Sequence, residues 1–470
     1  MRQFKELEQQ KVFKDISDVA DRLGYPCYVV GGFVRDLLLG IPNDDIDVVV
    51  VGSGLEIAKE YHKKVGGKLS VFENFGTADV VDPDGLEVQF VGARKESYER
   101  GSRKPICENG TLTDDLGRRD FTINAMAICL NKNEFGNLVD LFSGLGDLER
   151  KLIRTPIAPS TTFNDDPLRM LRCIRFAVKL GFEIDQPTWR GIVMNAGRLG
   201  IISMERIIEE MNKIMMSPDP KRGVLLLHQS GLLKQFLPEV SVLDTNDKEV
   251  GGTWHKNNFW HSINVLQNVA ERSDNLWLRW GALLHDIGKE PCKRYDPIYG
   301  WTFQDHDHAG ARMIPGIFRR LQLPLDERMT YVQKLVDMHM RPQNIANAGE
   351  DVTDSAVRRL CNDFGENVGD LMTLCESDLT TKNEAKKQAF INNFQRVREM
   401  IEDLKERDFV RLFQPCIGGN DIMEILHLKP GKLVGELKQY LKDAILDGKV
   451  PNEYDALLSL LMERAKELGI

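Results

Sequence analysis

Residues 29–51, VVGGFVRDLLLGIPNDDIDVVVV, decide how the first part of the chain folds. The initial apolar run is typical of a strand, and Gly31 with Gly32 forms the expected turn into an amphipathic helix. Asp45 and Asp47 then stand two residues apart at the start of a second apolar run. Because side chains alternate along a strand, both carboxylates face the same side. The stretch therefore predicts a strand, a glycine turn, a helix and a second strand that begins with paired carboxylates.

The two motifs in this stretch suit phosphate and metal chemistry. Glycines between a strand and a helix let backbone N–H groups approach a phosphate, and Arg35 adds positive charge one turn along. Two neighbouring carboxylates repel each other unless a cation lies between them, and Mg²⁺ is the usual cation in phosphoryl transfer. Each motif alone also fits a tight turn or a solvated strand edge. Together they favour a nucleotide site with Mg²⁺ at Asp45 and Asp47.

The whole chain divides into an α/β part and an all-α part. Up to residue 150, five runs rich in Val and Phe are typical of strands: YPCYVVGG (25–32), DIDVVVVG (45–52), GTADVVD (76–82), GLEVQFVG (85–92) and FGNLVDLF (135–142). Beyond residue 150, apolar residues recur at helical spacing. We expect an α/β head at 1–155 and three helical parts, at 156–245, 246–410 and 411–470.

The composition is that of a globular protein, with 42% hydrophobic and 28% charged residues. No apolar run approaches the roughly 20 residues of a membrane span. The charged start, MRQFKELEQQKVFKD, does not resemble a signal peptide. The eight cysteines contain no CxxC pair, which fits reduced thiols. We therefore expect a cytoplasmic protein with no membrane partner.

The charge is unevenly distributed along the chain. The net charge is −9, yet residues 150–222 carry 13 Lys and Arg against 8 Asp and Glu, which leaves −14 on the remainder. A basic segment in an acidic protein fits a surface that follows RNA phosphates. A solvated helical face explains the charge equally well.

Four segments in order resemble the class II nucleotidyltransferases, the family of CCA-adding enzymes and bacterial poly(A) polymerases. They are GGFVRD with the DID pair, RRDFTINAMA (118–127), NDDPLRMLRCIRFAVKLGF (164–182) and MERIIEEMNKIM (204–215). The resemblance implies that residues 1–155 form a catalytic α+β head with a polymerase-β-like mixed sheet, in which Asp45 and Asp47 are catalytic ligands of Mg²⁺. It implies an all-α body that begins with a nucleotide-template and RNA-binding neck at 156–245 and ends with a tail at 411–470 that contacts RNA. It also implies a nucleotide-binding set formed by Gly31, Gly32, Arg35, Arg119, Asp120, Asn124, Asp166, Arg169, Arg172 and Arg175. Glu87 is a candidate third carboxylate, whereas Glu205 fits a helix cap with a salt bridge.

Asp166 and Arg169 lie three residues apart at the start of an expected helix and are therefore neighbours on it. The resemblance implies that they pair with the base of the incoming nucleotide. On their pairing edges, cytosine and adenine both offer an amino donor beside an unprotonated ring nitrogen. A carboxylate can accept from the amino group, and a guanidinium can donate to the ring nitrogen. Uracil and guanine present a carbonyl and a ring N–H at these places, so neither contact can form. The expected substrates are CTP, ATP and tRNA. For Arg175, a solvated basic flank of the helix remains the alternative.

The segments after the carboxylate strand favour CCA addition over poly(A) addition. Bacterial poly(A) polymerases of this branch carry an Arg/Lys-Arg/Lys-Phe element there, which KVGGKLSVFENFGTADVV (64–81) lacks. ARKESYERGSRKPICENG (93–110) resembles the flexible loop of CCA-adding enzymes. Poly(A) addition and partial addition, of CC only or of A only, stay open as alternatives.

Six of the nine histidines fall between residues 255 and 339. HSINVLQNV, ALLHDIGK, FQDHDHAGA, DMHMRP and CESDLTTKN resemble the HD phosphohydrolase family in spacing and order. The resemblance implies a helical HD domain at 246–410. Its primary metal site would be formed by His261, His285, Asp286 and Asp378. A second position, for a metal or a phosphate, would be formed by His306 and His339. Such mixed ligands suit Mn, Fe, Ni or Zn better than Mg²⁺ alone, and a metal-bound hydroxide would attack a phosphoester. His255 and His308 fall outside the pattern.

Two other classes of protein fit the sequence less well. An RNA-binding scaffold without catalysis would not need the intact carboxylate pair and the intact HD ligands. A phosphohydrolase alone would leave Asp166 and Arg169 without a role. The tail resembles the small helical segment that ends this enzyme family, where KPGKLVGE (429–436) suits either RNA phosphates or simple helix packing.

Overall fold

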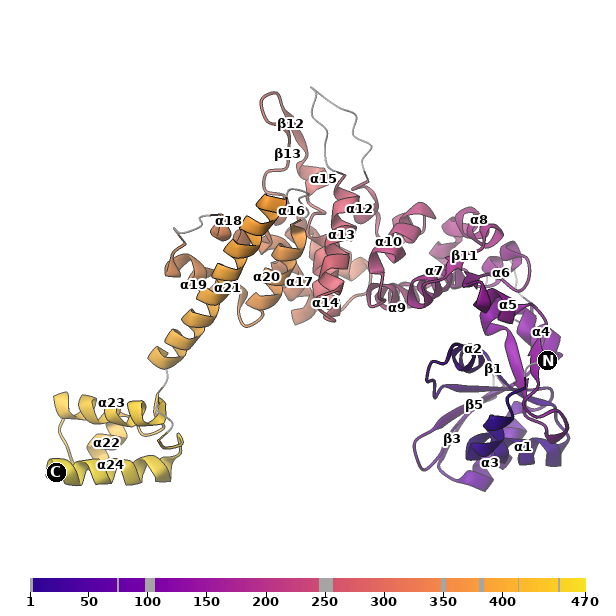
Figure 1. Ribbon diagram of the computed structural model, residues 1–470, viewed down its shortest axis with the longest axis horizontal. Coiled ribbons are helices and arrows are strands. Elements are labelled where there is room, and N and C mark those ends of the chain that lie inside the picture. The colour runs from indigo at the N-terminus through magenta and orange to yellow at the C-terminus, as the bar shows by residue number, and fades with distance from the viewer. Residues whose placement is uncertain are drawn as a thin grey trace. The chain divides into compact units, whose positions relative to one another are not determined.

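The computed structural model describes residues 3–73, 76–97, 106–244, 257–347, 352–379, 384–412, 414–446 and 449–470. Figure 1 shows the helices and strands along the chain. They group into two compact units. The first comprises Met1–His339 with Ser377–Thr380, and the second comprises Met340–Glu376 with Thr381–Ile470. A mixed sheet is followed by helices, so the predicted α+β head and all-α body are confirmed.

A seven-stranded sheet forms the head, in the order β3-β4-β5-β2-β1-β8-β9. Neighbours are antiparallel except for β2 and β5, which are parallel. The strands are β1 (Cys27–Val30), β2 (Ile46–Val50), β3 (Lys68–Phe72), β4 (Thr77–Val81), β5 (Glu87–Gly92), β8 (Met126–Cys129) and β9 (Leu138–Asp140). The five predicted strands are confirmed as β1, β2, β4, β5 and β9, whereas the sequence did not reveal β3 and β8.

Helix α3 (Gly54–Val65) covers one face of this sheet, and α1 (Lys11–Leu23) packs against α3. Tyr61 of α3 packs on Phe90 of β5, with ring centroids 5.3 Å apart. Phe90 pairs with Val48 of β2, so Val48 also faces α3. Because side chains alternate, Asp47 points to the opposite face. The polar site of the head therefore lies on the face that α3 does not cover.

Shorter elements complete the head: η1 (Lys5–Gln9), α2 (Gly32–Leu39), α4 (Leu112–Gly117), η3 (Thr122–Asn124), η4 (Lys132–Glu134) and α5 (Gly144–Glu149). Strands β6 (Arg94–Ser97) and β7 (Ile106–Asn109) pair with each other in antiparallel fashion. The two ends of the segment expected to be a flexible loop are therefore strands. Its middle, 98–105, lies outside the described residues.

The remainder of the first unit is helical, with two small β pairs. Its elements are β10 (Leu152–Ile153), α6 (Pro159–Asp165), α7 (Leu168–Leu180), β11 (Glu183–Ile184), α8 (Gln186–Asn195), η5 (Ala196–Ile201), α9 (Met204–Met215), α10 (Pro220–Gln229), α11 (Leu233–Phe236), α12 (Pro238–Ser241), α13 (Asn258–Ala270), α14 (Leu276–Leu284), α15 (Lys289–Cys292), β12 (Arg294–Asp296), β13 (Gly300–Thr302), α16 (His306–Arg320) and α17 (Glu327–Met338). The apolar residues at helical spacing on α7 are buried, as its sequence predicts: Leu168, Leu171, Ile174 and Val178.

A buried arginine joins three of these helices. Arg279 of α14 donates from Nη1 to the carbonyl of Met215 at 2.8 Å, and from Nη2 to the carbonyl of Ala270 at 3.2 Å. Met215 and Ala270 are the last residues of α9 and α13, so their carbonyls have no hydrogen-bond donor within their own helix. The indole of Trp280 donates to Asn212 at 2.9 Å and adds a second link to α9. The helices that follow α7 are thereby tied to the helices that carry the histidines.

The second unit consists of helices: α18 (Met340–Ala346), α19 (Asp354–Phe364), most of α20 (Val368–Asp378), α21 (Glu384–Leu412), α22 (Gly419–Ile425), α23 (Lys432–Leu446) and α24 (Tyr454–Leu468). The last three share an apolar core that includes Leu437, Leu441, Leu457 and Leu461. Among the described helices, none has both the length and the apolar character that crossing a bilayer requires.

Candidate functional site

A polar cavity of about 500 Å³ lies where the head meets α7. Its walls come from the β1–α2 turn, the loop before β2, the start of β2, the segment after α4, and one face of α7. The cavity brings together most of the residues predicted to bind nucleotide or Mg²⁺, namely Gly31, Gly32, Arg35, Asp45, Asp47, Arg119, Asp120, Asn124, Arg172 and Arg175.

Gly31 forms the turn at the base of this cavity. Its φ is 75°, a conformation that favours glycine. A Cβ atom at this position would lie 2.9 Å from Nη1 of Arg119 and 3.4 Å from Oδ2 of Asp47. Backbone conformation and close approach therefore both require glycine here, and the turn brings Arg119 beside Asp47.

The predicted carboxylate pair lies at the cavity, with Asp47 in β2 and Asp45 just before it. Burial raises the pKa of Asp47 to about 6, and although Arg119 acts against the shift, Asp45, Asp115 and Asp79 add to it. Asp47 is therefore a half-buried carboxylate with a second carboxylate, Asp45, beside it. A divalent cation held by oxygens of both side chains would offset the cost of burial and their mutual repulsion, so the donor set fits Mg²⁺.

The position of a third carboxylate is less defined. Glu87 begins β5, and the parallel register pairs Asp47 with Gln89, so Glu87 lies on the same face two residues earlier. The side chain of Glu87 is exposed and does not line the cavity. Asp79 of β4 pairs with Gln89 from the other side and accepts its amide at 3.0 Å. Glu87 stays a prediction, and Asp79 is a second candidate in the same cross-strand row.

Three guanidinium groups surround the ring of Phe176 at one side of the cavity. The Cζ atoms of Arg35, Arg172 and Arg175 lie 5.1, 5.5 and 4.5 Å from the ring centroid. Lys179, one helical turn beyond Arg175, also lines the cavity. The cavity thus has carboxylates at the start of β2 and a group of cations on α2 and α7, as a metal-bound triphosphate requires.

Buried carboxylates hold these arginines in place. Asp36 accepts hydrogen bonds from Nε and Nη2 of Arg35 at 2.7 and 2.8 Å. Asp120 lies 2.8 and 2.7 Å from the same two atoms of Arg172. Burial opposes the ionisation of Asp120, but the charge of Arg172 and the Asn124 amide outweigh it and lower the pKa of Asp120 to about 2.

Asp166 and Arg169, predicted to read the base, lie at the start of α7 but do not line the cavity. The Oδ1 atom of Asp166 accepts the backbone N–H of Leu168 at 3.0 Å, and its Oδ2 atom lies 3.3 Å from Nη2 of Arg206. Arg169 is 9% exposed and donates to the carbonyl of Thr162 at 3.4 Å. Asp166 therefore accepts the backbone N–H of the first residue of α7 and is held by Arg206 of α9, and its pairing with a base stays a prediction.

Sequence reasoning missed several residues that support the cavity. Glu210 of α9 is buried and lies 3.1 Å from Nε of Arg175. The side chain of Arg175 is only 14% exposed, so the alternative that it belongs to a solvated basic flank of the helix is wrong. Asp115 is fully buried and lies 2.6 Å from Arg118 and 3.2 Å from Arg119. These partners are distant in sequence or lie in a short helix, so periodicity gives no signal for them.

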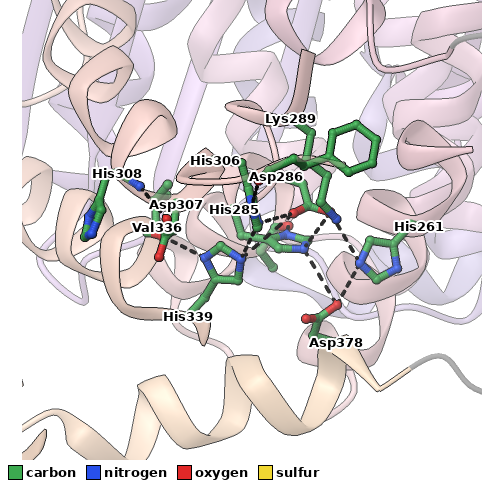
Figure 2. Close-up of polar contacts among 12 residues, drawn as sticks. His261, His285, Asp286, Lys289, His306, Asp307, His308, Val336, His339 and Asp378 are labelled. Atoms are coloured by element: carbon green, nitrogen blue, oxygen red, sulfur yellow. Dashed lines mark hydrogen bonds and ion pairs between the residues drawn. The ribbon is translucent and has the colours of Figure 1, made fainter. Parts of the chain in front are cut away.

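A second polar centre lies among α13, α14, α16, α17 and the end of α20, and all six predicted HD ligands converge on it (Figure 2). The Nε2 atom of His261 lies 2.7 Å from Oδ1 of Asp378 and 3.4 Å from Oδ2 of Asp286. The Nε2 atom of His285 lies 3.3 Å from the same Oδ2 atom. These four side chains form the primary set that the sequence predicts.

Asp286 also belongs to a second set of potential ligands. Its Oδ1 atom lies 3.5 Å from Nε2 of His306 and 3.9 Å from Nε2 of His339. The two imidazoles meet with their Nε2 atoms 3.3 Å apart. The ligand atoms form two groups, and within each group they lie within 4.8 Å of one another. One group is His261, His285 and Asp286, and the other is Asp286, His306 and His339. One carboxylate therefore lies between two potential metal positions.

Backbone carbonyls orient three of the four imidazoles. The Nδ1 atom of each bonds to the carbonyl three residues earlier: His285 to Ala282 at 2.8 Å, His306 to Phe303 at 2.9 Å and His339 to Val336 at 2.7 Å. A carbonyl only accepts, so each Nδ1 carries a proton, and each ring in its neutral form presents the Nε2 lone pair to the centre. This is the tautomer that binds a metal.

The centre fits a divalent metal. Among the described residues, the Nε2 atom of His285 and the Oδ1 atom of Asp286 are buried without a hydrogen-bond partner, which is costly unless a cation satisfies them. Burial lowers the pKa of His339 to about 4, so this imidazole is neutral and able to ligate. Lys289, which the sequence did not single out, lies 2.6 Å from Oδ2 of Asp286. Mixed nitrogen and oxygen donors suit a transition metal.

The remaining two histidines of the cluster differ from these ligands. His308 points away from the centre and lies 2.6 Å from Asp337, which agrees with its exclusion from the motif (Figure 2). His255 lies outside the described residues. Glu205 is exposed in the first turn of α9, where a negative charge favours the helix.

Comparisons with known proteins identify the same regions. Residues 27–154 match the poly A polymerase head domain, residues 181–243 the probable RNA and SrmB- binding site of polymerase A, residues 258–366 the HD domain, and residues 359–461 the putative domain 2 of tRNA nucleotidyltransferase. Asp378 falls beyond the HD match, although the structure places it with the HD ligands.

Relatives align with half of the chain or more. The A-adding tRNA nucleotidyltransferase of Halalkalibacterium halodurans is 38% identical over 453 residues, which cover 95% of this chain and 91% of that protein. The A-adding tRNA nucleotidyltransferase of Geobacter sulfurreducens is 40% identical over 263 residues, 55% of this chain and 29% of that longer protein. The Thermotoga maritima CCA-adding enzyme, solved in complex with tRNA, shares 25% identity at a TM-score of 0.61 over 98% of each chain. The chain therefore belongs to the tRNA nucleotidyltransferase family.

Proposed function

We propose that this chain adds a nucleotide to the 3′ end of tRNA and that the terminal A, taken from ATP, is the nucleotide it adds. The observation that supports the chemistry is the single cavity in which Asp45 and Asp47 lie opposite the cations of α2 and α7. In this reaction the RNA 3′-hydroxyl attacks the α-phosphorus of the nucleotide while the bond to pyrophosphate breaks. Bound Mg²⁺, held by Asp45 and Asp47, would activate the hydroxyl and neutralise the leaving pyrophosphate.

The side chains of the cavity bind and orient the triphosphate. Arg35, Arg172 and Arg175 present guanidinium groups around Phe176, and Lys179 extends the positive charge. The carboxylates of Asp36, Asp120 and Glu210 fix these guanidinium groups before substrate arrives, so that little side-chain entropy is lost on binding.

The base would be selected at the start of α7. Adenine offers an amino group to the carboxylate of Asp166 and a ring nitrogen to the guanidinium of Arg169. Because Asp166 is engaged by Arg206, reading a base requires its Oδ2 atom to exchange that arginine for the amino group. Guanine and uracil would leave both charged groups unpaired, so we expect GTP and UTP to be rejected.

Substitution of the carboxylate pair tests the catalytic site. Asp45→Asn or Asp47→Asn should lower kcat about 100-fold or more, because several kcal/mol of charge stabilisation is lost. Asp44→Asn is the matched control, since Asp44 is exposed, adjacent in sequence and not part of the cavity wall. Equal loss in all three variants would contradict the assignment.

Primer and nucleotide choice test the specificity. The two relatives named A-adding support addition of A to a tRNA that already ends in CC. Complete CCA addition is the second candidate, supported by the likeness to the Thermotoga enzyme. Incubation with ATP should extend tRNA ending in CC by one residue, and incubation with CTP should leave tRNA lacking CC unextended. Extension of the shorter tRNA by CTP would favour CCA addition, and a long A tail on any RNA would refute both.

We further propose that the HD centre hydrolyses phosphoesters with a bound transition metal. This activity is supported by the convergence of six side chains with nitrogen and oxygen ligand atoms, among them Asp286, whose Oδ1 atom is buried without a hydrogen-bond partner. His285→Ala with Asp286→Ala should abolish Mn²⁺-dependent hydrolysis of bis-p-nitrophenyl phosphate and spare nucleotide addition. His308→Ala, which removes an imidazole outside the centre, should change neither activity. Simultaneous loss of both activities in the double variant would contradict two separate sites.

A further inference from the structure

The hairpin formed by β12 and β13 has no role in the two sites described above. It connects α15 to α16 and projects from the helices around it (Figure 1). Two large side chains at its tip, Ile298 and Tyr299, are 83% and 80% exposed. The carboxylate of Asp296 accepts their backbone N–H groups at 2.7 and 2.9 Å, and Gly300 turns the chain at φ 74°. The tip therefore presents an aromatic ring on a defined backbone.

Aromatic and cationic side chains lie together on this hairpin. The ring of Tyr295 packs edge-on against Trp301, with centroids 5.3 Å apart. The ammonium group of Lys293 lies 4.5 Å from the centroid of Trp301. These contacts fix two rings and one cation on the hairpin, and Tyr299 adds a third ring beyond them.

A cavity of about 540 Å³ lies beside the hairpin and contains two arginines among its lining residues. Arg294 donates to the carbonyls of Pro291 and Lys293 at 3.4 and 2.7 Å. Arg312 of α16 is exposed. Neither guanidinium group forms an ion pair within the part of the chain that the structure describes. Tyr295 and Tyr299 also line the cavity, as do Asp296 and Asp305, so the formal charge of its lining is balanced. Because Asp296 accepts the backbone N–H groups of the tip, the two guanidinium groups remain the cationic donors that this lining offers to a phosphate.

We propose that the hairpin and its cavity bind single-stranded RNA, with an unpaired base stacked on Tyr299 and its phosphates at Arg294 and Arg312. Stacking rings beside cationic side chains are the features by which proteins bind single strands, since every base has a π-face and every nucleotide a phosphate. A protein partner that matched this surface would need acidic side chains at the same positions. The choice of RNA rests on the proposed function, because an unpaired tRNA segment is then the ligand at hand.

Binding of RNA by the full chain tests the proposal. The probes are a fluorescein-labelled uridine oligonucleotide of about ten residues and a labelled tRNA ending in CC, followed by fluorescence anisotropy. Tyr299→Ala should weaken oligonucleotide binding roughly tenfold, whereas Tyr299→Phe, which keeps the ring, should bind within about twofold of wild type. Arg294→Ala with Arg312→Ala should reduce the slope of log affinity against log salt by about 1.4, because two phosphate contacts are lost.

A matched variant controls for loss of charge. Arg22→Ala with Lys63→Ala removes two exposed cations that already pair with Glu60 on the head, and it should leave affinity and salt slope unchanged. Unchanged affinity in Tyr299→Ala and in the double arginine variant would overturn the proposal, as would an equal loss in the control variant. Capture of an acidic protein by the hairpin with unchanged RNA affinity would also overturn it.

Nucleotide addition separates this proposal from the proposed function. At saturating tRNA ending in CC, the hairpin variants should retain the wild-type rate, because no hairpin residue lines the catalytic cavity. Cross-linking of a 5-bromouridine oligonucleotide should place the adduct on residues 294–302. Intact addition with no adduct on the hairpin would overturn the hairpin proposal alone, whereas loss of addition in wild type would refute the catalytic one.

Discussion

Gly31 has two structural constraints that can be separated by mutation. Its φ of 75° strains any other residue, and a Cβ atom would meet Arg119 and Asp47. Gly31→Ala should lower the free energy of unfolding by about 1–3 kcal/mol and also reduce nucleotide addition. Gly24→Ala is the control, since Gly24 has a similar φ of 73° but open space around its Cβ position.

Urea denaturation and a primer-extension assay provide the two measurements. Gly24→Ala should lower stability by a comparable backbone strain of about 1 kcal/mol and retain activity. If the two variants lost activity equally, the close approach to Arg119 and Asp47 would have no bearing on catalysis.

Asp120 links stability to pH through its ion pair with Arg172. Its pKa of about 2 lies below the ordinary value of 3.8, so the ionised form stabilises the fold. This contribution, about 2 kcal/mol, is complete above pH 4 and is lost as the pH falls towards 2. Asp120→Asn should therefore be less stable than wild type at pH 7, and the difference should narrow at pH 3. Denaturation midpoints at both pH values measure the effect, and a constant difference would contradict it.

The side chains that sequence could identify are those whose chemistry is local. Asp45 and Asp47 are two residues apart on one strand, and the histidines stand out because they are rare and clustered. Glu210 was missed because only the packing of α9 against α7 brings it to Arg175. Arg206 likewise reaches Asp166 across 40 residues of sequence. Contacts of this kind depend on tertiary structure and leave no periodic signal.

Among the helices, the buried guanidinium of Arg279 is the main link between the C-terminal ends of α9 and α13. Arg279→Ala would leave those carbonyls buried without a donor and should lower the free energy of unfolding by about 3 kcal/mol. Arg279→Lys keeps the charge but lacks the planar fork, so it should restore only part of the loss. Trp280→Phe, which removes one bond to Asn212, should cost about 1 kcal/mol.

Chemical denaturation followed by circular dichroism compares these three variants. An Arg279→Ala variant as stable as Trp280→Phe would show that the link between the helices does not depend on the arginine.

The strands divide into those that periodicity can and cannot detect. β3 begins directly after Gly66 and Gly67 and is only partly buried along its length, so it has no alternating pattern. β8 is buried at all four positions and is short, which an apolar helix turn would match equally well. The parallel pairing of β2 with β5 joins strands separated by a helix and a hairpin. That order is a property of the assembled sheet and could not be derived from any one segment.

At the scale of the whole molecule, metal at the HD centre should stabilise the first unit. A ligand at 100 times its Kd adds about 2.7 kcal/mol to the free energy of unfolding. Mn²⁺ added after EDTA treatment should therefore raise the Tm in differential scanning fluorimetry. Asp286→Ala should abolish the rise because it removes the carboxylate between both metal positions. His308→Ala should retain it, and a rise that survives in Asp286→Ala would place the metal elsewhere.

The division into compact units explains one limit of reading domains from sequence. The HD motif predicts a continuous helical domain, yet Asp378 belongs to the first unit while the residues around it, up to Glu376 and from Thr381, belong to the second. The short segment Ser377–Thr380 therefore supplies one ligand to the first unit, although the chain on both sides of it belongs to the second. Neither composition nor linker residues indicate that a unit is built from separate segments of the chain. The predicted four-domain division stays a prediction.

The hydrogen bonds of His285, His306 and His339 to the carbonyls three residues earlier have a consequence for how the HD centre tolerates mutation. Many metal sites orient their imidazoles with a carboxylate side chain, which a single codon change can delete. Here the acceptor belongs to the main chain and is present whatever residue occupies positions 282, 303 and 336. Sequence drift around the centre can therefore proceed without disturbing the tautomer, provided that the local path of the backbone survives.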